Sequence, residues 1–139
     1  MGVTLLPDAA PEGREQSSQD PLVLIVEENS ADARPLRDIL ETAGYRTQLA
    51  GDAMDALRLV LEIQPDLVLT GIRLPGMDGL ALTRHLKNDP ATASIPVVAL
   101  SSRVNDKDRQ LALANGCRGF LARPYRYRTF LTEVADALE

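Results

Sequence analysis

The stretch "LVLIV", residues 22–26, decides the fold. A continuous apolar run of this length is typical of a strand that is covered on both faces of a sheet. Similar runs recur in "DLVLT", residues 66–70, and in "IPVVAL", residues 95–100. Two weaker strand signals, "YRTQLA" at 45–50 and "RGFLA" at 118–122, bring the expected number of strands to five.

The segments between these strands carry apolar residues at helical spacing. Five helices are expected, over residues 36–43, 53–61, 80–87, 106–115 and 130–138. Asp32, Asp52 and Asp106 are the expected N-caps of the first, second and fourth helices. An Asp32 cap places Pro35 in the first turn, where its missing N–H costs little. The alternation predicts a (βα)₅ fold, a doubly wound five-stranded parallel sheet with helices on both faces.

The chain of 139 residues divides into two parts by composition. Residues 1–20 mix Pro, Gly, Ser, Gln and acidic residues, and we expect them to form a flexible N-terminal leader. Residues 21–139 have enough apolar content for a single folded domain.

Composition also excludes several classes of protein. One cysteine and one histidine rule out a disulfide framework and a zinc site of familiar spacing. No run is long enough for a membrane span and no secretory signal is recognisable, so we expect a cytoplasmic protein without a membrane partner. A net charge of −5 argues against nucleic acid as a partner.

Ligands of doubly wound sheets bind beyond the carboxyl ends of the strands, so functional residues are sought there. Glu27 and Glu28 follow the first strand, and Gly71 follows the third. Ser101 follows the fourth strand, and Arg123 follows the fifth. These residues are the candidate site.

Four motifs in order carry a family resemblance: "LIVEEN", "PDLVLTGIRLPGMDG", "IPVVALSS" and "GFLARPY". Over Leu22 to Glu139 the chain resembles a stand-alone receiver domain of two-component response regulators. The resemblance implies a flavodoxin-like fold, and a site where an acidic pair, an Asp, a Ser or Thr and a Lys converge on Mg²⁺. It also implies that the fourth helix, fifth strand and fifth helix form the partner-binding face.

Carried over residue by residue, the resemblance places Glu27 and Glu28 at the acidic pair, whose second member holds Mg²⁺. Gly71 falls on the phosphoacceptor Asp, and Ser101 on the switch hydroxyl. Arg123 falls on the lysine that pairs with the phosphoryl group. Phe120 takes the place of the aromatic residue whose rotamer reports the state of the domain.

The departures at Gly71 and Arg123 predict a degenerate receiver. Glycine has no nucleophile, so no acyl phosphate can form at position 71. We expect no physiological metal site and at most weak Mg²⁺ binding at Glu28. Arg123 is expected to bridge to Glu27 or Glu28. Neither Thr70, which should face away, nor Asp78, further along the loop, is expected to replace the missing aspartate.

Gly71 has two alternative interpretations, and both remain open. In one, the backbone requires glycine at this position through a positive φ or a close approach of another group. In the second, a single residue was altered by design. The accompanying Arg123 and glutamate pair favour a naturally degenerate site.

A second candidate surface lies at the start of the last helix. Tyr125, Arg126 and Arg128 form part of a basic and aromatic cluster, although cations there oppose the helix dipole. We expect this cluster to be a partner face. The alternative is that its aromatic residues cover an edge of the core while the arginines are solvated.

The leading hypothesis is a non-enzymatic, atypical single-domain response regulator that acts by phosphorylation-independent protein–protein interaction. The expected partner is a histidine kinase, a phosphotransfer protein or a cyclase, with a homodimer also possible. The alternative is a small-molecule sensor that binds an anionic ligand through Arg123 and Arg126. Neither hypothesis requires a cofactor.

Overall fold

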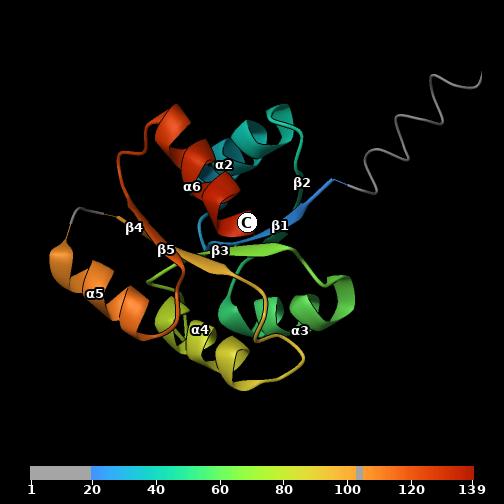
Figure 1. Cartoon of the computed structure of the whole chain (residues 1–139), viewed down its shortest axis with the longest axis vertical. Helices are drawn as coiled ribbons and strands as arrows, with labels where there is room; N and C mark the ends of the chain where they lie inside the picture. Colours follow the sequence, from blue (N-terminus) through green and yellow to red (C-terminus); the bar gives the residue numbers. More distant parts are fainter. Residues whose placement is uncertain (1–19, 103–104) are drawn as a thin grey trace, which may run out of the picture.

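A computed structural model describes residues 20–102 and 105–139. Strands and helices alternate along the chain: β1 (Leu22–Val26), α2 (Ser30–Thr42), β2 (Arg46–Ala50), α3 (Ala53–Ile63), β3 (Leu67–Gly71), α4 (Gly79–Asn88), β4 (Val97–Ser101), α5 (Asp106–Ala114), β5 (Gly119–Ala122) and α6 (Tyr127–Leu138). The strands form one parallel sheet in the order β2-β1-β3-β4-β5. Helices α2 and α6 cover one face, and α3, α4 and α5 cover the other (Figure 1). The predicted (βα)₅ fold class is confirmed.

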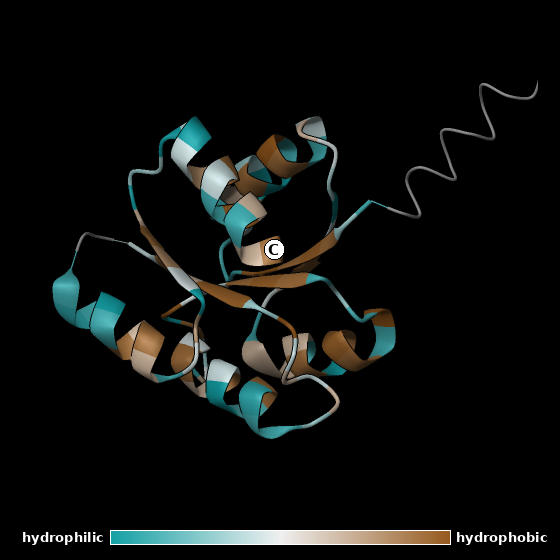
Figure 2. Ribbon diagram, in the orientation of Figure 1, coloured by the Kyte–Doolittle hydropathy of each residue, from teal (hydrophilic) through white to brown (hydrophobic). Residues whose placement is uncertain are grey.

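The apolar runs form the centre of two hydrophobic layers. Every residue of β3 and β4 is buried, as expected for strands covered on both faces. Successive side chains of each strand alternate between the layers: Leu24 packs towards α3 and α4, whereas Ile25 packs towards α2 and α6. Figure 2 shows the strands as largely brown, between helices that carry both brown and teal residues.

Two of the three predicted helix caps are wrong by one or a few residues. Asn29, not Asp32, caps α2: its Oδ1 accepts a hydrogen bond from the Ala31 N–H at 2.8 Å. The extended backbone of Asn29 allows this reach, so the helix begins earlier and Pro35 lies within it, beyond the first turn. Asn105, not Asp106, caps α5 for the same reason. The Asp52 cap of α3 is confirmed by its bond to the Asp55 N–H.

The strand register brings the ends of four strands to the same edge of the sheet. Val26 pairs with Thr70, so Glu27 comes beside Gly71. Ser101 pairs with Ala122, and the Arg123 N–H donates to the Ser101 carbonyl at 3.0 Å.

The predicted leader, apart from Asp20, lies outside the described residues. Within residues 20–102 and 105–139, no helix has the length and apolar character needed to cross a membrane.

Candidate functional site

A pocket of about 230 Å³ lies at the carboxyl edge of the sheet. Four of the predicted residues line it together: Glu27, Gly71, Ser101 and Arg123. Its other lining residues are Asp32, Ile72, Arg73, Leu100, Ser102, Asp108 and Tyr125. Glu28 is exposed and does not line the pocket. The structure therefore brings four of the five candidate residues together around one pocket and leaves Glu28 outside it.

Gly71 ends β3 on the floor of the pocket, and its backbone does not require glycine. Among the described residues, positive φ angles occur only at Gln64, Gly44, Gly76 and Gly116. A Cβ built at position 71 would lie 3.3 Å from the Glu27 Oε1 atom, which is the movable end of a side chain. A positive φ therefore does not explain the glycine, and a side chain at position 71 requires only that the Glu27 carboxylate move by a few tenths of an ångström.

Glu27 fills part of the space that a side chain at position 71 would occupy. One carboxylate oxygen, Oε1, points towards Gly71, and the other, Oε2, accepts a hydrogen bond from the Asn29 N–H at 3.2 Å. The backbone N–H of Glu27 is in turn bonded to the Ala50 carbonyl at 2.9 Å. The Glu27 carboxylate is therefore held over the glycine by its own loop.

Arg123 forms an ion pair with Asp32, and the predicted bridge to Glu27 or Glu28 is wrong. The Arg123 Nη1 atom lies 3.2 Å from Asp32 Oδ1. Since Asn29 caps α2, Asp32 is free to point from the first turn of the helix towards the strand ends. The Glu27 carboxylate faces Gly71 and the Asn29 N–H, and Glu28 faces solvent.

The electrostatic setting of Arg123 keeps it charged. Burial lowers the pKa of Arg123, but Tyr125 and Asp32 raise it by more, so the pKa lies above its ordinary value. The guanidinium carbon also lies 5.8 Å from the centre of the Tyr125 ring. Because the side chains of Arg123 and Asp32 are 38% and 36% exposed, their attraction is screened by water and contributes little to stability.

The residues present do not fit the Mg²⁺ site that the resemblance implies. Mg²⁺ takes oxygen ligands in near-octahedral geometry, mostly from one or two carboxylates and water. Here Asp32 is engaged by a guanidinium, and position 71 supplies no oxygen from a side chain. Within the described ranges, no group of three acidic, histidine or cysteine side chains is placed to hold a metal ion.

Thr70 and Asp78 have other structural tasks, as expected from their positions. Thr70 is fully buried, and its hydroxyl donates to the Gly71 carbonyl at 2.9 Å. Asp78 caps α4 by accepting from the Ala81 N–H at 2.8 Å. Neither side chain lines the pocket.

Phe120 lies in β5 beneath α5 and outside the pocket lining. The ring is 6% exposed, and the Arg109 guanidinium carbon lies 5.3 Å from its centre. Such a contact is a cation–π interaction that joins α5 to the sheet.

Sequence reasoning missed three charged residues of the pocket: Asp32, Arg73 and Asp108. Two of them lie on the first turns of α2 and α5, the helices that Asn29 and Asn105 cap. Recognising Asn29 as the cap of α2 would have released Asp32 from that role and made it a candidate ligand for Arg123.

A doubly wound parallel sheet with a pocket at the carboxyl ends of its strands, and with Glu27 and Arg123 after β1 and β5, is typical of α/β signalling and nucleotide-binding domains. A sequence model of the response regulator receiver domain matches residues 23–135. The chain belongs to this family, and it is a receiver domain of two-component signalling. Receiver domains of this kind generally interact with histidine kinases or phosphotransfer proteins.

Relatives support the assignment in sequence and in structure. The polar-differentiation response regulator DivK of Brucella anthropi is 33% identical over 116 residues, which cover 84% of this chain and 94% of that protein. The signal receiver domain of a histidine kinase from Syntrophus aciditrophicus is 32% identical, with a TM-score of 0.78 over 85% of this chain and 89% of that one.

A second similar structure offers a contrast at the site. The receiver domain of a sensor histidine kinase from Pseudomonas aeruginosa is 26% identical, with a TM-score of 0.78 over 86% of this chain and 98% of that one. Its structure was solved with a magnesium ion coordinated in the active-site cleft.

Proposed function

We propose that this receiver domain is a binding module that regulates a signalling partner without being phosphorylated at position 71. The partner would be a histidine kinase, a phosphotransfer protein or a cyclase. The module is not an enzyme, and it binds through a surface whose state does not depend on an acyl phosphate.

One observation carries the proposal: the position of the nucleophile is a glycine although the backbone would accept a side chain. An acyl phosphate requires a carboxylate, and none is attached to β3 at this point. The nearby Glu27 carboxylate is held by the Asn29 N–H, and Asp32 is held by Arg123. Two of the three carboxylates that line the pocket, those of Glu27 and Asp32, thus bond to the chain itself.

An anion sensor, the alternative, is less well supported by the charges of the pocket. Three carboxylates, those of Glu27, Asp32 and Asp108, line the pocket beside Arg73 and Arg123. Since Arg123 is already paired with Asp32, an anion would have to displace that carboxylate and approach the others. Like charges at such short range disfavour binding.

Incubation with acetyl phosphate and Mg²⁺, followed by intact-mass analysis, tests the proposal. We expect no acid-labile phosphoryl adduct on this chain, while a receiver that carries the acceptor aspartate becomes labelled in the same assay. A stoichiometric acid-labile adduct on the chain would overturn the proposal.

The Gly71→Asp variant sharpens this test. A Cβ at position 71 fits once the Glu27 carboxylate shifts by a few tenths of an ångström, and the variant adds a carboxylate to the residues that line the pocket. We expect Mg²⁺ to raise the melting temperature of this variant and not that of the unmodified chain, because a ligand stabilises the state that binds it. An equal rise in both proteins would show that Gly71 does not determine the metal affinity of the pocket.

A further inference from the structure

The helix α3 exposes apolar side chains on its outer face, in the part of the chain that the structure describes. Among its eleven residues, only Asp55, Arg58 and Glu62 are polar. A helix that is apolar on nearly every side is normally buried on every side. Here, however, Met54 is 65% exposed and Leu61 is 59% exposed. The sequence of α3 is therefore that of a helix with a second packing partner.

The exposed apolar residues of α3 form a single stripe. Met54, Leu57 and Leu61 follow one another at intervals of three and four residues, so they lie on one face of the helix. Leu57 is half-buried between the two exposed side chains. The residues that pack into the core are different ones: Ala53, Ala56, Leu59 and Val60. Met54, Leu57 and Leu61, here called the α3 stripe, are thus accessible to another molecule.

A groove of about 290 Å³ extends the α3 stripe towards α4. The two helices lie side by side on the same face of the sheet (Figure 1). Leu57 and Leu61 line the groove on the α3 side. His85, Asn88 and Asp89, all exposed, line it on the α4 side. The stripe therefore has a polar border that the same ligand can contact.

The charges beside the α3 stripe are mostly negative. Arg58 already binds two carboxylates of its own helix: it donates to Asp55 and, at 3.1 Å, to Glu62. Asp89 is exposed, and only one of its carboxylate oxygens has a partner among the described residues, the Ala91 N–H at 3.0 Å. Three carboxylates and one guanidinium thus flank the stripe, on a chain whose net charge is −5.

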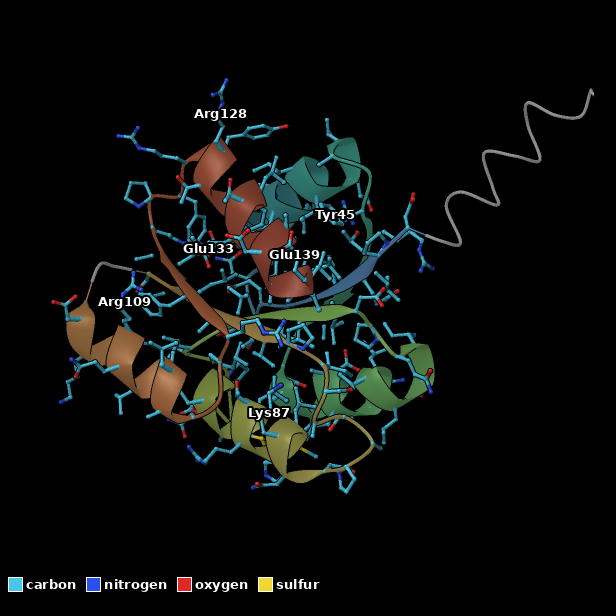
Figure 3. The ribbon with its side chains drawn as sticks, in the orientation of Figure 1. Tyr45, Lys87, Arg109, Arg128, Glu133 and Glu139 are labelled. Carbon is cyan, nitrogen blue, oxygen red and sulfur yellow. The ribbon has the colours of Figure 1, made fainter. Side chains whose placement is uncertain are left out.

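The lysine of α4 does not offset these carboxylates. Figure 3 shows Lys87 on this helix. Its Nζ atom donates to the Ala93 and Ile95 carbonyls, at 3.0 and 2.5 Å, in the segment that leads to β4. Lys87 does not line the groove. Its charge serves the connection between α4 and β4, and the groove keeps an acidic border.

We propose that the α3 stripe docks a basic amphipathic helix of a partner protein. The apolar side chains of that helix pack on Met54, Leu57 and Leu61, and its lysines or arginines pair with Asp89 and with Glu62. An amphipathic helix presents its anchors at intervals of three and four residues, which is the spacing of the stripe itself.

Charge complementarity favours this occupant over the others. A second copy of the chain would bring two molecules of net charge −5 together, with the same carboxylates on both sides. Anionic lipid headgroups and nucleic-acid phosphates would be repelled in the same way. The proposal rests on the proposed function, since it names a partner surface of a module that acts by binding.

The probe is a fluorescein-labelled designed peptide of about four helical turns, with Leu on one face and Lys on the other. We expect saturable binding to the full chain at about 0.15 M salt, measured by fluorescence anisotropy. Leu61→Glu should weaken binding roughly tenfold or more, since it replaces a central apolar anchor by a charge. Equal affinity for this variant and the unmodified chain, or no saturable binding, overturns the proposal.

Leu113→Glu is the matched control for Leu61→Glu. Leu113 is 49% exposed on α5 and does not line the groove, so the same substitution is made at a similar exposure elsewhere. We expect its affinity for the peptide to stay within about twofold of the unmodified chain. A larger loss for Leu113→Glu than for Leu61→Glu would move the binding surface to α5 and overturn the proposal.

The charge of Asp89 is tested separately. Asp89→Asn keeps an oxygen that can accept from the Ala91 N–H but removes the negative charge. We expect about two- to fivefold weaker binding, as is usual for a charge at the rim of an interface. Asp38→Asn, which removes a carboxylate from the exposed face of α2, is the control and should have no effect. A peptide in which Glu replaces every Lys should not bind, and binding of that peptide with equal affinity overturns the basic partner.

Amide chemical shifts of the unmodified chain locate the peptide independently of any variant. Shifts centred on Met54, Leu57 and Leu61 support the stripe, whereas shifts centred on α2, α5 or α6 overturn it. Sedimentation without peptide tests a second copy as the occupant: a dimer that Leu61→Glu dissolves overturns the partner helix. Absence of peptide binding together with absence of a phosphoryl adduct would remove this surface but leave the proposed function standing.

Discussion

The apolar interior of the sheet and the pocket at its carboxyl edge place different demands on their residues. In the interior, β3 and β4 are buried along their whole length, so each side chain is fixed by its neighbours. In the pocket, the Arg123–Asp32 pair is more than one-third exposed, and Gly71 has room for a side chain. A receiver frame can therefore persist while the chemistry at its edge changes.

Two glycines eight residues apart show the same contrast. A Cβ at Gly79 would lie 2.0 Å from the Gly71 carbonyl oxygen, because the start of α4 crosses directly over the end of β3. A Cβ at Gly71 would have one tight contact, at 3.3 Å with the end of the Glu27 side chain, and ordinary contacts with Leu74 at 3.7 Å and the Val26 carbonyl oxygen at 3.8 Å. Gly79 is required by packing, whereas Gly71 is permitted by it.

The largest effect is expected in the interior. Leu24→Ala removes a fully buried side chain from the layer beneath α3 and α4, and we expect the free energy of unfolding to fall by about 2–5 kcal/mol. Urea denaturation measures the change. Glu27→Gln, a pocket substitution of nearly equal volume, is the control and should change stability by less than about 1 kcal/mol. A larger loss of stability for Glu27→Gln than for Leu24→Ala would contradict the expectation that the interior is the more sensitive region.

The glycine pair gives a smaller and more specific effect. Gly79→Ala forces α4 away from β3, and we expect it to destabilise the fold by roughly 1–3 kcal/mol. Gly71→Ala is expected to lie within about 1 kcal/mol of the unmodified chain, since only a movable carboxylate must adjust. Thermal unfolding of both variants decides the matter, and equal destabilisation would mean that Gly71 also has a packing role.

The same contrast explains how much the sequence predicted. The runs at 22–26, 66–70 and 95–100 identified buried strands because a strand covered on both faces needs apolar residues on both. The strand ends then located Glu27, Gly71, Ser101 and Arg123 at one edge, since parallel strands end together. Burial and strand direction can therefore be predicted from the order of apolar and polar residues along the chain.

The side-chain pairs within the pocket could not be predicted from the sequence in this way. Arg123 has a long side chain, and Glu27, Glu28 and Asp32 were all within plausible reach. The choice of Asp32 depended on a cap that Asn29 forms through one hydrogen bond of 2.8 Å. Asn, Ser and Asp stabilise a helix N-terminus to a similar extent when they act as caps. The sequence therefore does not determine which of several neighbouring residues of these types is the cap.

A double-mutant cycle measures the strength of the Arg123–Asp32 ion pair in the pocket. Arg123→Ala and Asp32→Ala should each reduce stability modestly, and their coupling energy should be about 0.2–1 kcal/mol, because the pair is partly exposed to water. Urea denaturation of both single variants and the double variant gives this value. The Glu28→Ala and Arg123→Ala pair is the control, with no expected coupling. A coupling above about 3 kcal/mol would place the ion pair among buried interactions.

The smallest effect concerns Tyr125, which lines the strand-end pocket beside Arg123. Burial raises the pKa of Tyr125 above its ordinary value, although the nearby Arg123 cation partly opposes the rise. Below the usual tyrosine pKa, about 10, the phenol is neutral in the folded and unfolded chains alike, and its contribution to stability is fully present. Between that value and the raised pKa of the folded state, only the unfolded chain loses the proton, so stability falls as the pH rises.

Tyr125→Phe should therefore flatten the loss of stability above about pH 10, because the unfolded chain no longer gains from ionising this phenol. The variant keeps Tyr45 and Tyr127, so the difference between the two urea denaturation series isolates one ring. Arg123→Ala should move the pKa of Tyr125 further upward, because it removes the cation that lowers it. Absorbance of the tyrosinate follows that shift directly. A downward shift would show that the pocket stabilises a phenolate and that its charges act on Tyr125 in the opposite sense.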